Sequence, residues 1–169
     1  NAPDFTLTDT KGITHSLSDY QGKTVILEWT NHLCPFVQKH YSTGNMQALQ
    51  EEAVNSGKIW LTINTSAPGT QGYTTPEEAN AIIAETGALA TARLLDPGGT
   101  VGRLYGAKAT PHMYVINPEG TLVYAGAIDD NPSSDPETIK TATNYVSRAL
   151  ENLASGQPID PAVTQVMFL

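Results

Sequence analysis

Residues 25–41 read VILEWTNHLCPFVQKHY, and the architecture can be inferred outward from them. Val25–Trp29 is short and almost continuously apolar, which is typical of a strand buried on both faces of a parallel sheet. A short loop follows. Cys34-Pro35 then predicts a helix start, because proline is favoured at the first helical position. The unit is therefore a buried strand, a loop and a helix that begins at the only cysteine of the chain.

Strand and helix signals alternate along the rest of the chain. Further strands are predicted at residues 59–64, 94–95, 113–116 and 122–127, the last two flanking the turn sequence NPEG. Further helices are predicted at residues 46–54, 76–86, 100–105 and 135–156, with a break at residues 42–45. This order predicts an α/β fold with a central mixed sheet flanked by helices, parallel strands first and an antiparallel hairpin at one edge.

Composition limits the classes of function. A chain of 169 residues, 40% of them hydrophobic, suits one packed domain spanning residues 1–169, with residues 157–169 as a C-terminal tail. A net charge of -8 with only nine Lys and Arg argues against nucleic-acid binding. No apolar run approaches the ~18 residues that span a bilayer. A single cysteine excludes an internal disulfide, so any redox cycle must end with an external thiol or a second copy of the chain.

Cys34 is the residue to which the sequence assigns chemistry. The thiolate is the reactive form, and a helix N-terminus lowers the pKa of a thiol below its ordinary value of about 8.5 through unpaired N–H groups and partial positive charge. The alternative is that Cys34 is a small buried hydrophobe, as many free cysteines are. Its place after a buried strand favours function, because α/β proteins put their sites at the C-terminal ends of strands.

Thr110-Pro111 precedes a predicted strand and is the second unusual feature. A proline there is tolerated at a sheet edge or in a special backbone geometry. An ordinary trans proline and a cis proline are both compatible with the local sequence, and trans is far commoner.

Three segments carry a family resemblance: APDF at residues 2–5, EWTNHLCPFVQKHY at residues 28–41 and ATPHMYVI at residues 109–116. With the order of elements, they resemble the thioredoxin superfamily and, more narrowly, the redoxin (AhpC/TSA) group of peroxiredoxin-like proteins. The resemblance covers nearly the whole chain. It implies a thioredoxin-like fold with an N-terminal extension, a cis-Pro111 packed beside Cys34, and a thiol oxidoreductase or thiol-dependent peroxidase that needs no cofactor.

The chain departs from that family at positions that define its chemistry. Val37 stands where thioredoxins carry the second cysteine, and Asn31 stands where peroxiredoxins carry Thr or Ser. Residues 109–112 lack the arginine that polarises a peroxide, and the final TQVMFL holds no further cysteine. We therefore expect Cys34 to attack a disulfide or a peroxide and to be resolved by an external thiol.

Five neighbours complete the predicted site. Thr110 and Pro111 would hold the substrate chain, while Asn31 and His32 could donate hydrogen bonds to the reacting group. Glu28 interrupts the apolar strand and has two interpretations. It is either a proton relay whose pKa is raised by burial, or a partly solvated carboxylate at the strand end. The partners implied are an external thiol reductant or a disulfide-bearing protein.

Two other functions are compatible with the sequence. Cys34, His32 and His112 could bind copper or zinc, since both metals take thiolate and imidazole ligands; His40 is expected to lie at the surface or in a hydrogen bond. The chain could also be a redox-inactive interaction domain. It opens at Asn1 without an initiator methionine, and exported proteins are common among thioredoxin-fold relatives, so we expect a periplasmic or secreted location.

Overall fold

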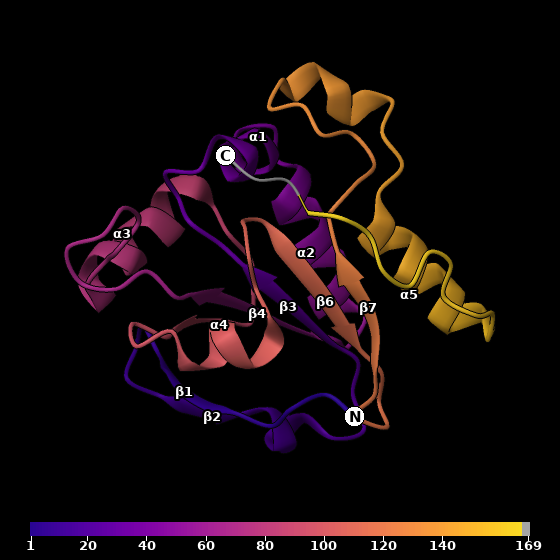
Figure 1. The fold of residues 1–169 in the computed structure, drawn as a ribbon, viewed down its shortest axis with the longest axis horizontal. Coiled ribbons are helices and arrows are strands. Elements are labelled where there is room, and N and C mark those ends of the chain that lie inside the picture. Colours follow the sequence, from indigo (N-terminus) through magenta and orange to yellow (C-terminus); the bar gives the residue numbers. More distant parts are fainter. Residues whose placement is uncertain (167–169) are drawn as a thin grey trace.

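The apolar run Val25–Trp29 forms strand β3, and all five of its residues are buried. In this computed structural model, which describes residues 1–166, β3 pairs in parallel with β4 (Ile59–Asn64) and antiparallel with β6 (His112–Ile116). The described strands form one seven-stranded mixed sheet in the order β2-β1-β5-β4-β3-β6-β7 (Figure 1). The predicted α/β fold with parallel central strands and an antiparallel edge hairpin is confirmed.

The remaining elements have clear bounds. The other strands are β1 (Thr6–Asp9), β2 (Thr14–Ser16), β5 (Ala92–Leu95) and β7 (Leu122–Gly126). The helices are α1 (Pro35–Ser42), α2 (Asn45–Asn55), α3 (Pro76–Thr86), α4 (Thr100–Tyr105) and α5 (Tyr145–Ser155), with two short 3-10 helices, η1 (Leu17–Tyr20) and η2 (Pro136–Lys140). In the part of the chain described, no helix combines the length and apolar character that a membrane crossing requires.

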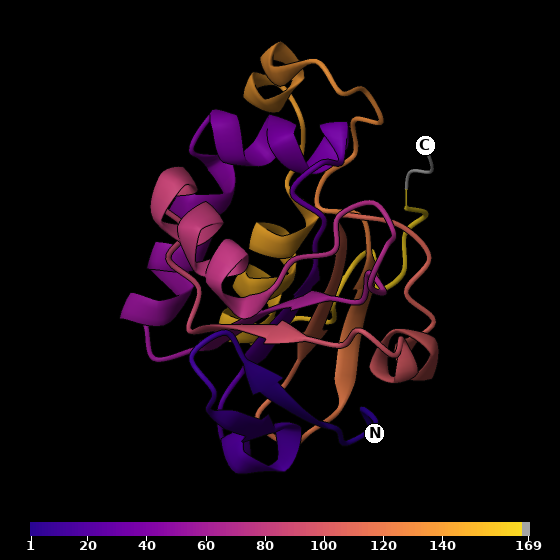
Figure 2. The ribbon, with the colours of Figure 1, turned by 90° about the vertical axis from the view of Figure 1, so that its left-hand side faces the viewer.

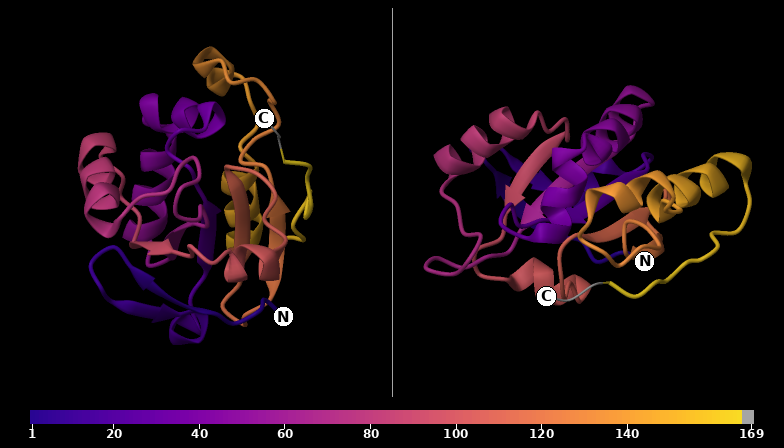
Figure 3. Two further views of the ribbon diagram at one scale, coloured as in Figure 1. Left: turned by 60° about the vertical axis from the view of Figure 1, so that its left-hand side comes forward. Right: turned by 90° about the horizontal axis from the view of Figure 1, so that it is seen from above.

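The sheet separates two hydrophobic cores. Alternate residues of a strand point to opposite faces, so Ile26 faces one core and Leu27 the other. α2 and α5 cover the first face through Met46 and Val146, and α4 covers the second through Val101. Figures 2 and 3 show α4 on one side of the sheet and α2 and α5 on the other. Both faces of β3 are therefore shielded from water, as its apolar sequence requires.

The N-terminal hairpin of β1 and β2 is not predicted by the sequence pattern. β1 reads TLTD and offers a single apolar residue, so it carries no buried-strand signal. β1 is held in the sheet by its antiparallel pairing with β5, in which Thr8 lies opposite Leu95 and Asp9 opposite Leu94. The N-terminal extension thus lengthens the central sheet.

The continuous final helix predicted from residue 135 to about 156 is wrong. η2 ends at Lys140, and α5 begins only at Tyr145. Between them the backbone bonds to a distant segment: the Thr143 N–H donates to Asp130 Oδ1 (2.8 Å) and the Tyr145 N–H to the Ile128 carbonyl (2.8 Å). These tertiary hydrogen bonds keep Thr143 and Asn144 outside a helix. Asn144 then starts α5, its Oδ1 accepting from the Ser147 N–H at 2.9 Å.

We expect Asn144→Ala to lower the free energy of unfolding by about 1 kcal/mol, because it leaves an N–H of the first turn of α5 without its acceptor. Asp135→Ala is the matched control, since Asp135 caps only the short, exposed η2. Urea unfolding should show the larger loss at Asn144. Equal losses would mean that this cap does not stabilise the C-terminal helix.

Candidate active site

Cys34 lies at the end of the loop that joins β3 to α1. It is the N-terminal cap residue of α1, with Pro35 at the first helical position, which confirms the predicted helix start. The Cys34 N–H donates to the Asn31 carbonyl at 3.0 Å, and the Gln38 N–H donates to the Cys34 carbonyl at 2.9 Å. The loop thus closes as a tight turn and places the cysteine at the positive end of the helix.

The thiol faces the segment that precedes β6. Cys34 Sγ donates to the Thr110 carbonyl at 3.3 Å, and the Thr110–Pro111 peptide is cis. The cis-proline beside the cysteine, implied by the family resemblance, is confirmed. Cys34 is 2% exposed, so a reaction partner must displace the Thr110 contact to reach the sulfur.

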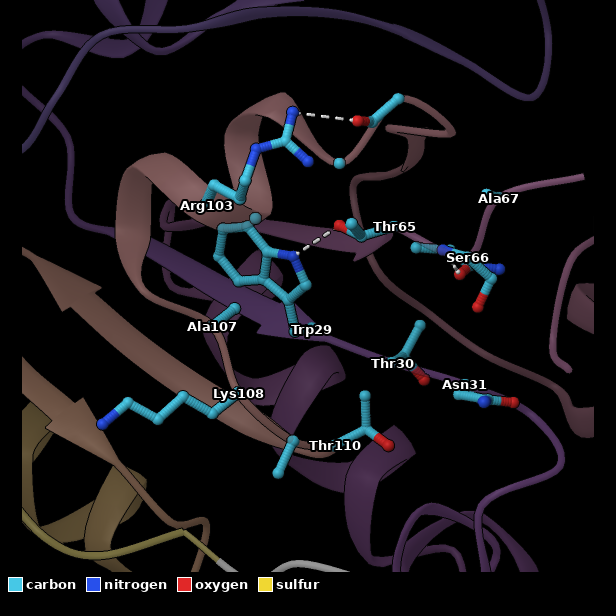
Figure 4. Close-up of a pocket in the computed structure, with 15 residues that line it drawn as sticks. Trp29, Thr30, Asn31, Thr65, Ser66, Ala67, Arg103, Ala107, Lys108 and Thr110 are labelled. Atoms are coloured by element: carbon cyan, nitrogen blue, oxygen red, sulfur yellow. Dashed lines mark hydrogen bonds between the residues drawn. The ribbon is translucent and has the colours of Figure 1, made fainter. Parts of the chain in front are cut away.

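A cavity of about 420 Å³ opens beside this contact (Figure 4). Thr30, Asn31 and Thr110 line it on the cysteine side. Asn31 Oδ1 accepts from the Leu33 N–H at 2.9 Å, so its first role is to shape the loop. Gly72, at a φ of +86°, packs so closely on the Asn31 amide that any Cβ there would collide with it. The loop before α3 therefore closes against the cysteine loop.

The far wall of this cavity was not predicted from the sequence. Trp29 Nε1 donates to Thr65 Oγ1 (2.9 Å), and that hydroxyl donates to Asp96 Oδ2 (3.0 Å), as Figure 4 partly shows. Lys108 and Arg103 complete the wall. Thr65 and Asp96 directly follow β4 and β5, so the rule that sites form at the ends of parallel strands was the available signal.

His32 lies on the opposite side of the loop. It lines a second cavity, of about 570 Å³, together with Thr30 and Arg93. Burial lowers the pKa of His32, and the Arg93 charge lowers it further, while Glu78 acts in the opposite direction. Thr30 lines both cavities, which therefore flank the cysteine loop on either side.

Glu28 is completely buried, so the interpretation of a partly solvated carboxylate at the strand end is wrong. β3 is central and covered on both faces, and no water reaches the carboxylate. Instead Tyr41 OH donates to Oε2 (2.7 Å), while Trp60 Nε1 (2.9 Å) and Gln50 Nε2 (3.1 Å) donate to Oε1. Burial raises the pKa of Glu28, and these hydrogen bonds partly oppose the rise. No hydrogen bond in the described structure joins Glu28 to Cys34.

The three candidate metal ligands are not brought together. His112 lies opposite Trp29 in the β3–β6 register, its ring stacks on Tyr114 at 4.6 Å between centroids, and its Nδ1 accepts from the Lys108 N–H at 3.4 Å. It therefore sits on the α4 side of the sheet, because residues 112 and 114 share one face. Across residues 1–166, no three His, Cys, Asp or Glu side chains are grouped to hold a metal ion.

His40 lies in hydrogen-bonded surroundings, as expected. Its Nδ1 accepts from Asn45 Nδ2 at 2.8 Å, and its Nε2 lies 3.9 Å from Asp129 Oδ2. Burial, then the Lys39 charge, lowers the pKa of His40 to about 4, so the ring is neutral at pH 7. At pH 7 Asp129 therefore faces an uncharged imidazole ring, and the contact is not an ion pair.

Stability should fall in mild acid because of the buried histidines. Burial, with Lys108, lowers the pKa of His112 from 6.5 to about 4, so between these values the unfolded chain binds the extra proton. The contribution of neutral His112 to the free energy of unfolding is fully present above pH 6.5 and is lost as the pH falls to 4. His40 behaves in the same way. The loss is on the order of 3 kcal/mol for each histidine.

His112→Phe keeps a ring against Tyr114 and removes the titration. Urea unfolding at several pH values should show a shallower acid loss for this variant than for the wild type. Parallel curves would contradict a neutral buried His112.

Comparisons with known proteins were consistent with this geometry. The model of the AhpC/TSA family matches residues 1–125. The thiol-disulfide oxidoreductase ResA of Geobacillus kaustophilus is 38% identical over 73 residues, which are 39% of this chain and 42% of that protein, so the match spans less than half of the relative.

Two solved structures share the fold. A hypothetical protein from Sinorhizobium meliloti has a TM-score of 0.82 and 24% identity, over 98% of this chain and 87% of its own. An exposed lipoprotein thioredoxin from Streptococcus pneumoniae has a TM-score of 0.58 and 25% identity, over 82% of this chain and 96% of its own. The predicted thioredoxin-like fold is confirmed.

Proposed function

The chain belongs to the AhpC/TSA family, and from this premise we propose that it is a thiol oxidoreductase whose reacting group is Cys34. The observation that carries the proposal is the contact between the Cys34 sulfur, at the N-terminus of α1, and the carbonyl that precedes cis-Pro111. A substrate chain that enters between these two segments would contact both the Cys34 sulfur and the backbone of Thr110 and Pro111.

In the reaction with a disulfide, the Cys34 thiolate attacks one sulfur of the substrate. A mixed disulfide forms, and the other sulfur leaves as a thiolate. Because the sequence holds no second cysteine, an external thiolate then attacks the mixed disulfide, forms a disulfide with the substrate sulfur and releases the Cys34 thiolate. With a peroxide, the Cys34 thiolate attacks one oxygen, the O–O bond breaks and the other oxygen leaves as an alcohol or water, which leaves Cys34 as a sulfenic acid. One external thiol then displaces water to form a mixed disulfide, and a second external thiol releases the Cys34 thiol and an external disulfide.

The surrounding residues have distinct proposed roles. Thr110 and Pro111 would present their backbone to the substrate chain. Asn31 would donate to the reacting atoms through its side-chain amide nitrogen. Its side-chain oxygen already accepts a hydrogen bond from the Leu33 N–H. His32, whose Nδ1 has no partner within residues 1–166, is the second proposed donor.

A disulfide-bearing protein is the proposed partner, with an external thiol as the reductant. The similarity to the ResA thiol-disulfide oxidoreductase supports a disulfide over a peroxide, as does the lack of a peroxide-polarising arginine in residues 109–112. The proposed location is extracytoplasmic, supported by the structural likeness to an exposed lipoprotein thioredoxin.

A second candidate is a redox-inactive interaction domain, which the 2% exposure of Cys34 favours. The two proposals differ in one measurable property. An oxidoreductase must expose the sulfur while folded, whereas an interaction domain would expose it only on unfolding.

We expect the folded wild type to release one thiolate per chain from a small aromatic disulfide reagent, and Cys34→Ser to release none. Absorbance of the released thiolate measures the reaction, and mass spectrometry locates the adduct. A wild type that reacts only in denaturant, at the rate of global unfolding, would reject the oxidoreductase and support the interaction domain.

Glu28 is the proposed proton relay for the thiol, and its test is the pH profile of the same reaction. We expect Glu28→Gln to slow the reaction by up to about 10²-fold. It should also remove an acid-side limb that lies above the ordinary pKa of 4.5, because burial raises the pKa of Glu28. Glu51→Gln, at an exposed site on α2, is the matched control. Circular dichroism checks folding, and an unchanged pH profile would leave Glu28 with a structural role only.

A further inference from the structure

The second cavity, between α1 and α3, holds three unpartnered polar groups, of which the proposed reaction uses only His32. Its walls come from the cysteine loop, from both helices and from β5. Three of its residues, Thr30, His32 and Arg93, each carry a buried side-chain atom that finds no hydrogen-bond partner within residues 1–166. Buried polar groups without partners are rare in native proteins, so three on one cavity point to a missing ligand.

Arg93 is the strongest of these observations. It is only 6% exposed, its Nε has no partner, and no hydrogen bond or ion pair to its guanidinium occurs in the described part of the chain. A buried charge without a counter-charge is strongly unfavourable. An anion in the cavity would supply both the charge and the acceptors.

Glu28 does not serve as that anion. It lies on the same face of the sheet, two strands away, through the pairs Glu28–Thr62 and Thr62–Arg93. Its two oxygens are already engaged by Tyr41, Trp60 and Gln50. The guanidinium lowers the pKa of Glu28 only through space, without an ion-pair contact.

The other two groups suit the same anion. The Thr30 hydroxyl, 2% exposed, can donate one hydrogen bond. A neutral His32 can donate from the ring nitrogen that carries its proton. With Arg93 they form a set of donors for the two oxygens of a carboxylate, which a guanidinium binds well.

The rest of the cavity defines the body of the ligand. Leu33, Val37 and Ile82 supply apolar wall, whereas Glu85 places a negative charge on the lining and disfavours a second anionic group. A volume of about 570 Å³ is suited to a small molecule.

We propose that this cavity binds a small organic monocarboxylate, its carboxylate held by Arg93, His32 and Thr30 and its apolar chain lying against Val37 and Ile82. The site is separate from the Cys34 sulfur, which forms its contact with Thr110 at the other cavity. The proposal therefore stands whether or not Cys34 is redox-active.

Isothermal titration calorimetry with 4-methylpentanoate tests the site directly. Saturable binding to the wild type is expected, with at least tenfold weaker binding of the neutral 4-methylpentanamide. Inorganic sulfate is the third probe. Sulfate binding as tight as that of the carboxylate would overturn the apolar part of the proposal, and no saturable carboxylate binding would overturn it entirely.

Arg93→Met keeps the length of the side chain and removes its charge. At least a tenfold loss of 4-methylpentanoate affinity is expected, and Thr30→Val should weaken binding less. Arg148→Met, at an exposed site on α5, is the matched control and should bind like the wild type.

Stability separates a ligand-binding role from a structural one. If Arg93 serves a ligand, Arg93→Met should unfold at the same or a higher urea concentration than the ligand-free wild type, because an unpaired buried charge has been removed. If the fold itself instead requires the Arg93 charge, the variant will unfold at a lower urea concentration than the wild type. That outcome, or unchanged carboxylate affinity in a folded variant, would overturn the proposal.

Discussion

The pairing of β3 on both edges is the constraint on which the rest of the structure depends. Its antiparallel register with β6 places Trp29 opposite His112. The loop that leaves β3 and the segment that enters β6 must therefore run side by side. Cys34 Sγ and the Thr110 carbonyl, 76 residues apart in sequence, meet as a result. The candidate active site is thus a consequence of strand order, as in other α/β folds in which strand ends create sites.

The same central position makes polar residues in the sheet costly, and each must be compensated. Glu28 is compensated by three donors from α1, α2 and β4, which hold it within the core. Arg93, in the same row of the sheet, has no such partners in the described structure. The contrast distinguishes a buried acid whose hydrogen bonds are satisfied within the core from a buried cation for which we propose a ligand.

Most of the elements could be predicted because their signals are local. Apolar runs identified the central strands, and Pro35 marked a helix start that the structure confirms. The predictions failed where contacts between distant segments determine the secondary structure. β1 is a strand because β5 offers it a free edge, and the final helix is interrupted because Asp130 and Ile128 bind the backbone of residues 143–145.

By itself, the sequence determined the helix that starts at Cys34, the single thiol and the missing second cysteine, since capping and composition are properties of neighbouring residues. Only the tertiary structure decided that Glu28 is completely buried, that His112 lies on the α4 side of the sheet, and that Arg93 shares a cavity with His32. The physical reason is that the environment of a side chain depends on which strands become neighbours and which face each residue takes, and neither is encoded within a few residues of it.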